Sequence, residues 1–187
     1  MNEYAQIPAK QERQGNRGFS LIETMFAIIV LMVGVMSLAA VLGAGVAYMN
    51  SSQQSFIAQQ KATETVESIF TARDSGVLSF PSIQNVGSGA GIFLNGALQL
   101  CDPGPDGIVG TADDNCAIPD EIVAPGPDGI LGTADDIKTP LSNFTRTIVI
   151  NNVPGNPALR TITVTINYTV GRFQRSYSTS TLISAAF

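Results

Sequence analysis

The stretch that decides the fold spans residues 18–49 and reads GFSLIETMFAIIVLMVGVMSLAAVLGAGVAYM. Glu23 is its one charged residue, and no further charge follows until Lys61. A helix that spans a bilayer needs about 20 consecutive apolar residues, and this segment exceeds that length. A lone carboxylate within hydrocarbon costs roughly 2.5–3.5 kcal/mol on insertion scales, so we expect Glu23 to have a partner and a function.

Basic residues precede the apolar segment. Lys10, Arg13 and Arg17 lie shortly before Phe19, whereas no Lys or Arg closely follows the apolar run. Positive charges that flank a transmembrane helix tend to stay in the cytoplasm. We therefore expect the N-terminus to lie in the cytoplasm and the residues beyond the helix to lie on the other side of the membrane.

Together these residues resemble the N-terminus of type IV prepilins, in which a basic leader, a glycine, Phe and then Glu precede an apolar helix. Here the matching residues are Gly18, Phe19 and Glu23. The resemblance implies that a prepilin peptidase cleaves between Gly18 and Phe19 and that the new amine is methylated. It also implies that Glu23 pairs with the Phe19 amine of another pilin subunit when an inner-membrane platform assembles the filament. The charges agree, because a buried carboxylate requires a cation beside it.

Two simpler interpretations of the N-terminus remain open. A secretory signal peptide has an apolar core of about 7–15 residues followed by a small-x-small cleavage site, and the run here is roughly twice as long. No such site stands out before Tyr48. An uncleaved single-span anchor explains the length and the orientation, but it does not explain a carboxylate so soon after a Gly-Phe junction.

Beyond Met49 the helical pattern turns amphipathic, and its apolar positions recur at helical spacing. They are Ala58, Ala62, Val66, Ile69 and Phe70. This pattern predicts one helix over residues 20–73, ended by Asp74, Ser75 and Gly76. The expected parts of the chain are a leader at 1–18, a transmembrane or filament-core half-helix at 19–49, an amphipathic half-helix at 50–76 and a globular β domain at 77–187.

The C-terminal third alternates between apolar and polar residues, as strands with one buried face do. Residues 145–151, 160–170 and 173–183 predict three antiparallel strands, with a turn at 152–157. Two shorter strands are expected at residues 92–94 and 97–100. The expected fold class is α+β, with a long N-terminal helix packed on an antiparallel sheet, which is also what the pilin resemblance implies.

Composition limits the classes of function. The sequence has a formal net charge of −5 and contains no histidine. An acidic protein is poorly suited to binding the phosphate backbone of nucleic acids. Without histidine the usual general base is missing, and no set of nucleophile and base is recognisable. We therefore expect neither an enzyme nor a direct nucleic-acid partner.

The two cysteines, Cys101 and Cys116, lie in the part that we expect to be exported. Exported proteins fold in an oxidising environment, which favours a disulfide between them. Such a bond closes a loop of about 15 residues and stabilises the fold by roughly 3 kcal/mol in the chain-entropy model. A pair of free thiols is the alternative.

An internal repeat occupies an acidic insert at residues 101–137. Residues 103–114 read PGPDGIVGTADD and residues 125–136 read PGPDGILGTADD, so eleven of twelve positions are identical. Nine acids and no Lys or Arg lie between Asp102 and Asp136. This concentration of negative charge is repulsive unless a cation neutralises it.

Calcium is the expected cation, because it prefers several oxygen ligands on a tightly turned backbone. The candidate ligands are Asp102, Asp106, Asp113, Asp114, Asp128, Asp135 and Asp136. The spacing departs from an EF-hand, since Gly104 stands at the third ligand position and Ala124 replaces the first ligand of the second repeat. The loops resemble the Asp-Gly calcium loops of bacterial surface proteins. Two solvated acidic turns without a metal ion are the alternative.

These features predict a structural subunit of a type IV pilus-like filament. Residues 27–34 and 60–63 resemble a PilV-type minor pilin more than a major pilin. The alternatives are a type II secretion pseudopilin and a monomeric, membrane-anchored, calcium-dependent adhesion module. We expect the protein in the bacterial inner membrane before assembly, and in a periplasmic or cell-surface filament afterwards.

Overall fold

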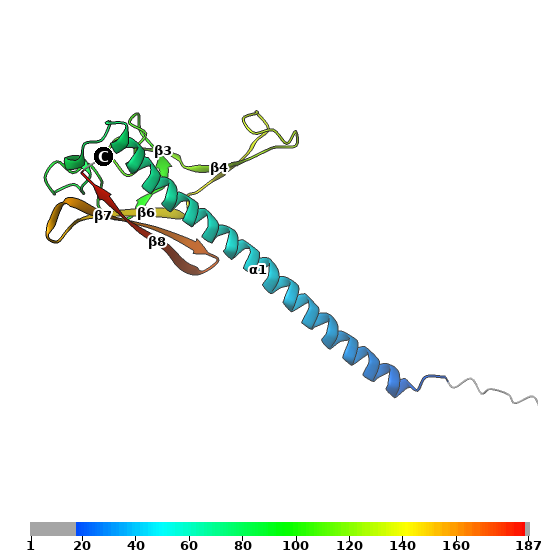
Figure 1. Cartoon of the computed structure of the whole chain (residues 1–187). Helices are drawn as coiled ribbons and strands as arrows, with labels where there is room; N and C mark the ends of the chain where they lie inside the picture. The colour runs from blue at the N-terminus through cyan, green and yellow to red at the C-terminus, as the bar shows by residue number, and fades with distance from the viewer. Residues whose placement is uncertain (1–17, 186–187) are drawn as a thin grey trace, which may run out of the picture. The chain divides into compact units, whose positions relative to one another are not determined.

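The computed structural model describes residues 18–185 (Figure 1). Most of the expected leader, including Lys10, Arg13 and Arg17, lies outside the described residues. The chain forms two compact units whose boundary falls between Val46 and Ala47. One helix runs through this boundary, and the sheets belong to the second unit.

Helix α1 (Leu21–Asp74) contains 54 residues. Its bounds differ by one residue at each end from the predicted range of 20–73. No proline occurs between Phe19 and Arg73, so the hydrogen-bond ladder has no built-in interruption. The helix ends where Gly76 adopts a positive φ of 76°, a conformation that costs a residue with a side chain more than it costs glycine.

The first unit consists of the apolar part of α1. Every described residue from 18 to 50 is exposed. Within residues 18–185, α1 is the one helix that is long and apolar enough to cross a membrane. A helix satisfies all of its own backbone hydrogen bonds, which makes it suited to an apolar surrounding. The exposed apolar side chains are compatible with membrane anchoring.

The second unit is built on a four-stranded antiparallel sheet with the order β1-β6-β7-β8. Its strands are β1 (Leu98–Gln99), β6 (Phe144–Val153), β7 (Asn156–Val170) and β8 (Phe173–Ser184). In the register, Val164 of β7 lies between Ile148 of β6 and Thr179 of β8. The β6–β7 turn is tighter than the predicted turn at 152–157, because Pro154 and Gly155 alone separate the two strands.

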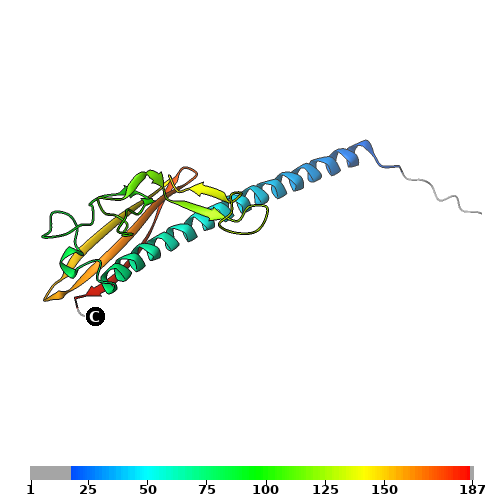
Figure 2. The same cartoon turned by 90° about the horizontal axis from the view of Figure 1, so that it is seen from above.

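The core lies between one face of this sheet and the C-terminal half of α1, which runs along the sheet (Figure 2). Alternate residues of β6 and β7 point into it, and most of them are β-branched. The helix contributes small residues and isoleucines, namely Ile57, Ala58, Ala62, Ile69 and Ala72. Burying each large aliphatic side chain stabilises the fold by about 1.5–3 kcal/mol. The predicted α+β class, with a long helix packed on an antiparallel sheet, is confirmed.

The segment between α1 and the sheet contains little regular structure. A short 3₁₀ helix, η1 (Phe80–Ser82), is followed by an isolated bridge between Asn85 and Phe93. The predicted strand at 92–94 is therefore wrong, because these residues lie in a loop, with Phe93 buried and Ile92 and Leu94 half-buried. The amide of Leu94 donates to the carbonyl of Gly110 across this loop (2.9 Å). Of the predicted strand at 97–100, only the two residues of β1 (Leu98–Gln99) form a strand.

Two small sheets were not predicted, and each carries one copy of the repeat. Strands β2 (Cys101–Asp102) and β3 (Asn115–Pro119) enclose the first copy. Strands β4 (Glu121–Ala124) and β5 (Ile137–Pro140) enclose the second copy at the tip of a hairpin. We call residues 103–114 the first loop and residues 125–136 the second loop.

Candidate functional site

The N-terminal candidate residues lie at the start of α1. Gly18 and Phe19 precede the helix, and Glu23 is the acidic residue of its first turn. Phe19 is exposed, and none of the ion pairs among the described residues involves Glu23. A carboxylate in the first turn interacts favourably with the helix dipole, by roughly 0.3–1 kcal/mol. Glu23 is itself exposed, as are its neighbours in the first turn.

The cysteine prediction is confirmed, because Cys101 and Cys116 form a disulfide with Cα atoms 4.7 Å apart. Neither cysteine is free, so the alternative of two thiols is wrong. The bond joins β2 to β3 beside the first loop. It therefore holds both ends of the first loop together, while the second loop depends on the pairing of β4 with β5.

The first loop uses its carboxylates to order its own backbone. Oδ1 of Asp106 accepts a hydrogen bond from the amide of Ile108 (2.8 Å), and Oδ2 of Asp114 accepts one from the amide of Gly110 (2.7 Å). The Thr111 hydroxyl lies 2.6 Å from Oδ1 of Asp113. Each aspartate thus satisfies a donor that would otherwise be unpaired in a tight turn.

The second loop repeats this arrangement almost bond for bond. Oδ1 of Asp128 accepts from the amide of Ile130 (2.8 Å), and Oδ2 of Asp136 accepts from the amide of Gly132 (2.7 Å). The Thr133 hydroxyl donates to Oδ1 of Asp135 at 2.6 Å. The sequence repeat is therefore also a structural repeat. In both copies the aspartates stabilise the conformation of the loop.

The glycine at the second position of each repeat is required by packing. A Cβ atom at Gly104 would overlap the carboxylate and carbonyl of Asp113. A Cβ atom at Gly126 would overlap the same groups of Asp135. The position that departs from an EF-hand is therefore the point where the two sides of the loop touch.

The threonine hydroxyls also shift the acidity of their neighbours. The pKa of Asp113 lies below its ordinary value of 3.8, mainly because Thr111 donates to the carboxylate. The pKa of Asp135 is lowered in the same way by Thr133. A hydrogen bond to the ionised form favours that form, so both carboxylates stay charged in moderately acidic solution.

The two loops differ in their surroundings. In the first loop Ile108, Val109 and Thr111 are buried in the second unit. In the second loop the corresponding Ile130 and Leu131 are exposed, and Thr133 is half-buried. The first copy of the repeat is therefore packed in the core, whereas the second copy lies at the surface.

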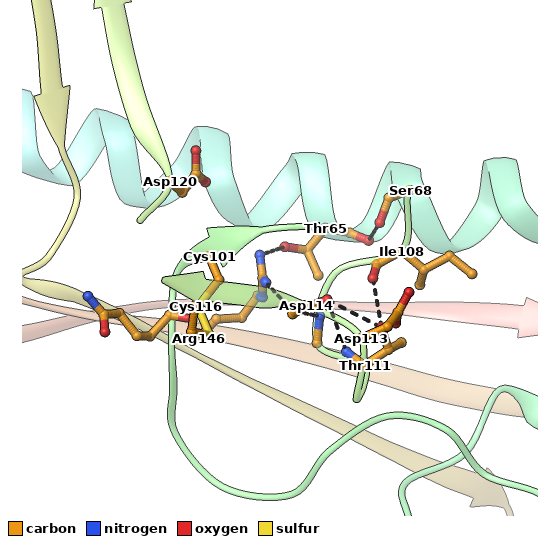
Figure 3. A network of polar contacts seen from close by, with 12 residues as sticks. Thr65, Ser68, Cys101, Ile108, Thr111, Asp113, Asp114, Cys116, Asp120 and Arg146 are labelled. Atoms are coloured by element: carbon orange, nitrogen blue, oxygen red, sulfur yellow. Dashed lines mark hydrogen bonds and ion pairs between the residues drawn. A yellow bond between two sulfur atoms is a disulfide. The ribbon is translucent and has the colours of Figure 1, made fainter. Parts of the chain in front are cut away.

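A buried arginine faces the first loop (Figure 3). Arg146 points from the inner face of β6, and its Nη2 lies 3.8 Å from Oδ2 of Asp114. Its Nη1 lies 3.4 Å from the hydroxyl of Thr65 on α1. Burial lowers the pKa of Arg146, and the charges of Asp114, Asp120 and Glu64 partly oppose this effect. Arg146 thus links helix, sheet and first loop.

Two lysines neutralise further acids of the insert. Nζ of Lys61 lies 2.8 Å from Asp120 and 3.0 Å from Glu64. Burial by itself lowers the pKa of Lys61, but hydrogen bonds and charge interactions with these carboxylates outweigh it, so the pKa is raised. Lys138 pairs with Glu121 at the base of the β4–β5 hairpin (2.8 Å). The Lys61 pair attaches the insert to α1, and the Lys138 pair joins the two strands of the hairpin.

Arg146, Lys61 and Lys138 neutralise part of the negative charge that calcium was expected to neutralise. Within residues 18–185, no group of three or more Cys, Asp or Glu side chains is placed to hold a metal ion. Asp102 lies in β2, whereas the other six candidate ligands lie within the two loops. Asp106, Asp114, Asp128 and Asp136 are engaged by loop amides. Calcium binding at these residues stays a prediction.

Sequence reasoning missed Arg146, Lys61 and Lys138, because it counted cations only within the insert. One signal was present for Arg146. It occupies an inward position of the alternating strand, in line with Phe144, Ile148 and Ile150. A charged residue in that series indicates a buried partner, since an isolated charge in a core is strongly unfavourable.

Comparisons with protein-family models, with curated proteins and with solved structures give no significant match.

Proposed function

We propose that this chain is a structural subunit, of the minor-pilin kind, in a type IV pilus-like filament. It is held in the bacterial inner membrane by the first half of α1 and joins the filament through the same helix. The observation that carries the proposal is Glu23, a single carboxylate in the first turn of an apolar helix whose described residues are exposed up to residue 50.

The exposed apolar side chains require an apolar surrounding. They occur on every side of the helix, as in Ile28, Ile29, Val30, Leu31 and Met32. Water is an unfavourable solvent for such a surface, by about 25 cal/mol for each Å². Lipid before assembly and the helices of sister subunits after assembly both meet the requirement.

The position of Glu23 supports assembly rather than simple anchoring. A lipid anchor gains nothing from a carboxylate, which costs roughly 2.5–3.5 kcal/mol in the hydrocarbon region. Cleavage after Gly18 by a prepilin peptidase creates an amine at Phe19, and an amine is a cation at neutral pH. In a filament, this amine of one subunit neutralises Glu23 of the next.

The second unit supports an exported domain. The Cys101–Cys116 disulfide is of a kind that persists in oxidising compartments. Its place beyond the apolar helix agrees with an N-terminus that stays in the cytoplasm. In the proposed role, this domain faces outward from the filament or caps its tip.

The N-terminal residue of the mature protein tests the proposal. Mass spectrometry of the protein from its native membrane should give Phe19 with a methylated amine. An intact Met1 in assembled material would refute the filament role. A type II secretion pseudopilin shares this processing, so deletion of the gene distinguishes the two machines. Loss of pili supports a pilus subunit, and loss of protein secretion supports a pseudopilin.

A membrane-anchored, calcium-dependent adhesion module is the second candidate. It is favoured by the second loop, where Asp128, Asp135 and Asp136 take part in none of the ion pairs found in residues 18–185. A bound cation stabilises the fold by mass action. If calcium binds there, EGTA should lower the thermal midpoint of the full chain, and added calcium should restore it. An unchanged thermal midpoint would refute calcium binding.

A further inference from the structure

The second loop has the same structure as the first loop, but its apolar side chains are exposed. It forms the tip of the β4–β5 hairpin, where Ile130, Leu131 and Ile137 are all exposed. The carboxylates of Asp128 and Asp135 in the same loop are also exposed, and neither forms an ion pair with a described residue. Exposed apolar side chains that lie together mark interaction sites more often than single ones do.

The first loop shows what such a unit packs against. Its apolar pair, Ile108 and Val109, is buried, and the side chain of Ile148 lies close to the neighbouring Gly110. Its last aspartate, Asp114, faces the guanidinium of Arg146. The natural complement of the repeat is thus an apolar surface with an arginine beside it.

The β7–β8 hairpin presents an exposed aromatic side chain with arginines beside it. Phe173 is 73% exposed there, between Arg172 and Arg175. In the part of the chain that is described, neither arginine forms an ion pair. Next to them is a groove of about 490 Å³, whose lining includes Asn143, Thr145, Asn167, Gln174, Arg175 and Ser176.

The two tips are separated within one chain. In Figure 1 the part of α1 that packs on the sheet passes between the β4–β5 hairpin and the β7–β8 end of the sheet. A contact between the second loop and the β7–β8 hairpin therefore requires a second molecule. Opposite charges steer such an encounter and set its register, while the apolar residues supply the buried area.

We propose that the second loop of one copy docks on the β7–β8 hairpin of a second copy of this chain. Ile130 and Leu131 pack on Phe173, and the exposed carboxylates of Asp128 and Asp135 face Arg172 and Arg175. Because different patches of the two copies meet, the contact continues from copy to copy as a ring or a helical filament. The inference rests on the proposed assembly role and names the contact between the outer domains.

Cross-linking between full-length chains tests the geometry. Two tagged forms are produced together in one membrane, one with Leu131→Cys and the other with Phe173→Cys, and a short bis-maleimide is added. The native cysteines do not react, because they form a disulfide. Mixed dimers should form in several-fold greater yield than with Leu131→Cys and Val77→Cys, a control position that is 63% exposed. Equal yields would overturn the proposal.

Charge substitution tests the recognition. Ala134→Lys places a cation on the second loop and should lower the cross-link yield several-fold. Ala112→Lys is the matched control, since it lies at the same repeat position in the first loop and is also exposed. Arg172→Glu with Arg175→Glu on the partner should lower the yield with the unmodified loop and restore it with Ala134→Lys. Equal effects of the two alanine substitutions, or no restoration, would contradict the charge pairing.

The two proposals fail separately. Cross-link yield reports docking of the outer domains, whereas the N-terminal residue of the mature protein reports the filament role. Filament subunits that begin at Phe19 but give no specific cross-link would refute the docking alone. A specific cross-link between chains that still begin at Met1 would refute the filament role and leave the docking in place.

Discussion

Ile108 and Ile130 occupy the same position of the two repeat copies, yet Ile108 is 2% exposed and Ile130 is 60% exposed. Their loops have the same local hydrogen bonds, so the local sequence does not cause the difference. The cause is attachment. The disulfide and Arg146 hold the first loop on the core, whereas the second loop stands at the end of its own hairpin.

This pair gives a matched test of burial. Ile108→Ala should lower the free energy of unfolding by about 2–5 kcal/mol, because it leaves a cavity in the core. Ile130→Ala should change it by less than about 0.5 kcal/mol, since the side chain is exposed. Urea unfolding of the full chain in detergent measures both. Equal effects would mean that the loops have similar surroundings.

Arg146→Met should lower the free energy of unfolding by roughly 3–5 kcal/mol, because it leaves Asp114 buried without its cation. The Asp114 side chain is 8% exposed, so water cannot readily replace the arginine. Adding Asp114→Asn should recover part of the loss, since the unpaired charge is then removed. A double variant less stable than Arg146→Met would argue against the ion pair.

The lowered pKa of Asp135 gives a prediction about acid. A group whose pKa is lower in the folded state stabilises the fold above its ordinary pKa of 3.8, and this contribution is lost as the pH falls through the lowered value. Thr133→Val removes the hydroxyl donor and should raise the pKa of Asp135 toward 3.8. An NMR titration of the carboxyl carbons measures the change.

Asp113 serves as the internal reference in the same sample, because its donor, Thr111, is intact. The substitution at Thr133 should leave the pKa of Asp113 where it was. An unaltered pKa at Asp135 would show that the threonine does not control its acidity.

Removal of the disulfide should destabilise the second unit. Cys101→Ser with Cys116→Ser opens a loop with a sequence separation of 15 residues. The expected loss is about 3 kcal/mol in the free energy of unfolding. The first loop should become more sensitive to protease than the second, because only the first is closed by this bond. Equal cleavage of the two loops would contradict this account of their attachment.

Glu23→Ala should leave cleavage after Gly18 possible but reduce incorporation into filaments. The reason is that the Phe19 amine of a neighbour then lacks its counter-charge. Glu67→Ala is the matched control, because Glu67 is an exposed acid on the same helix outside the apolar segment. Quantitative immunoblots of sheared filaments and membranes measure both. Normal incorporation of the Glu23 variant would refute the pairing role.

Periodicity was a good guide where one pattern continued for many residues. The helix over residues 20–73 and the strands β6, β7 and β8 were predicted to within a few residues, because each buries one regular face. The segment at 92–94 shows where this reasoning fails. A short apolar run is also held in a loop when its backbone finds partners there, here the Gln84 carbonyl for the amide of Phe93 and the Gly110 carbonyl for the amide of Leu94.

The amino-acid sequence by itself determined the long helix with its single carboxylate, the alternating strands and the repeated loop, because each follows from local spacing and backbone preference. Only the tertiary structure decided which basic side chains pair with the acidic ones and which of the two loops is buried. Arg146 and Asp114 are 32 residues apart in the sequence, and Lys61 and Asp120 are 59 apart. Such pairs form when the helix and the sheet pack together, and no local pattern specifies them.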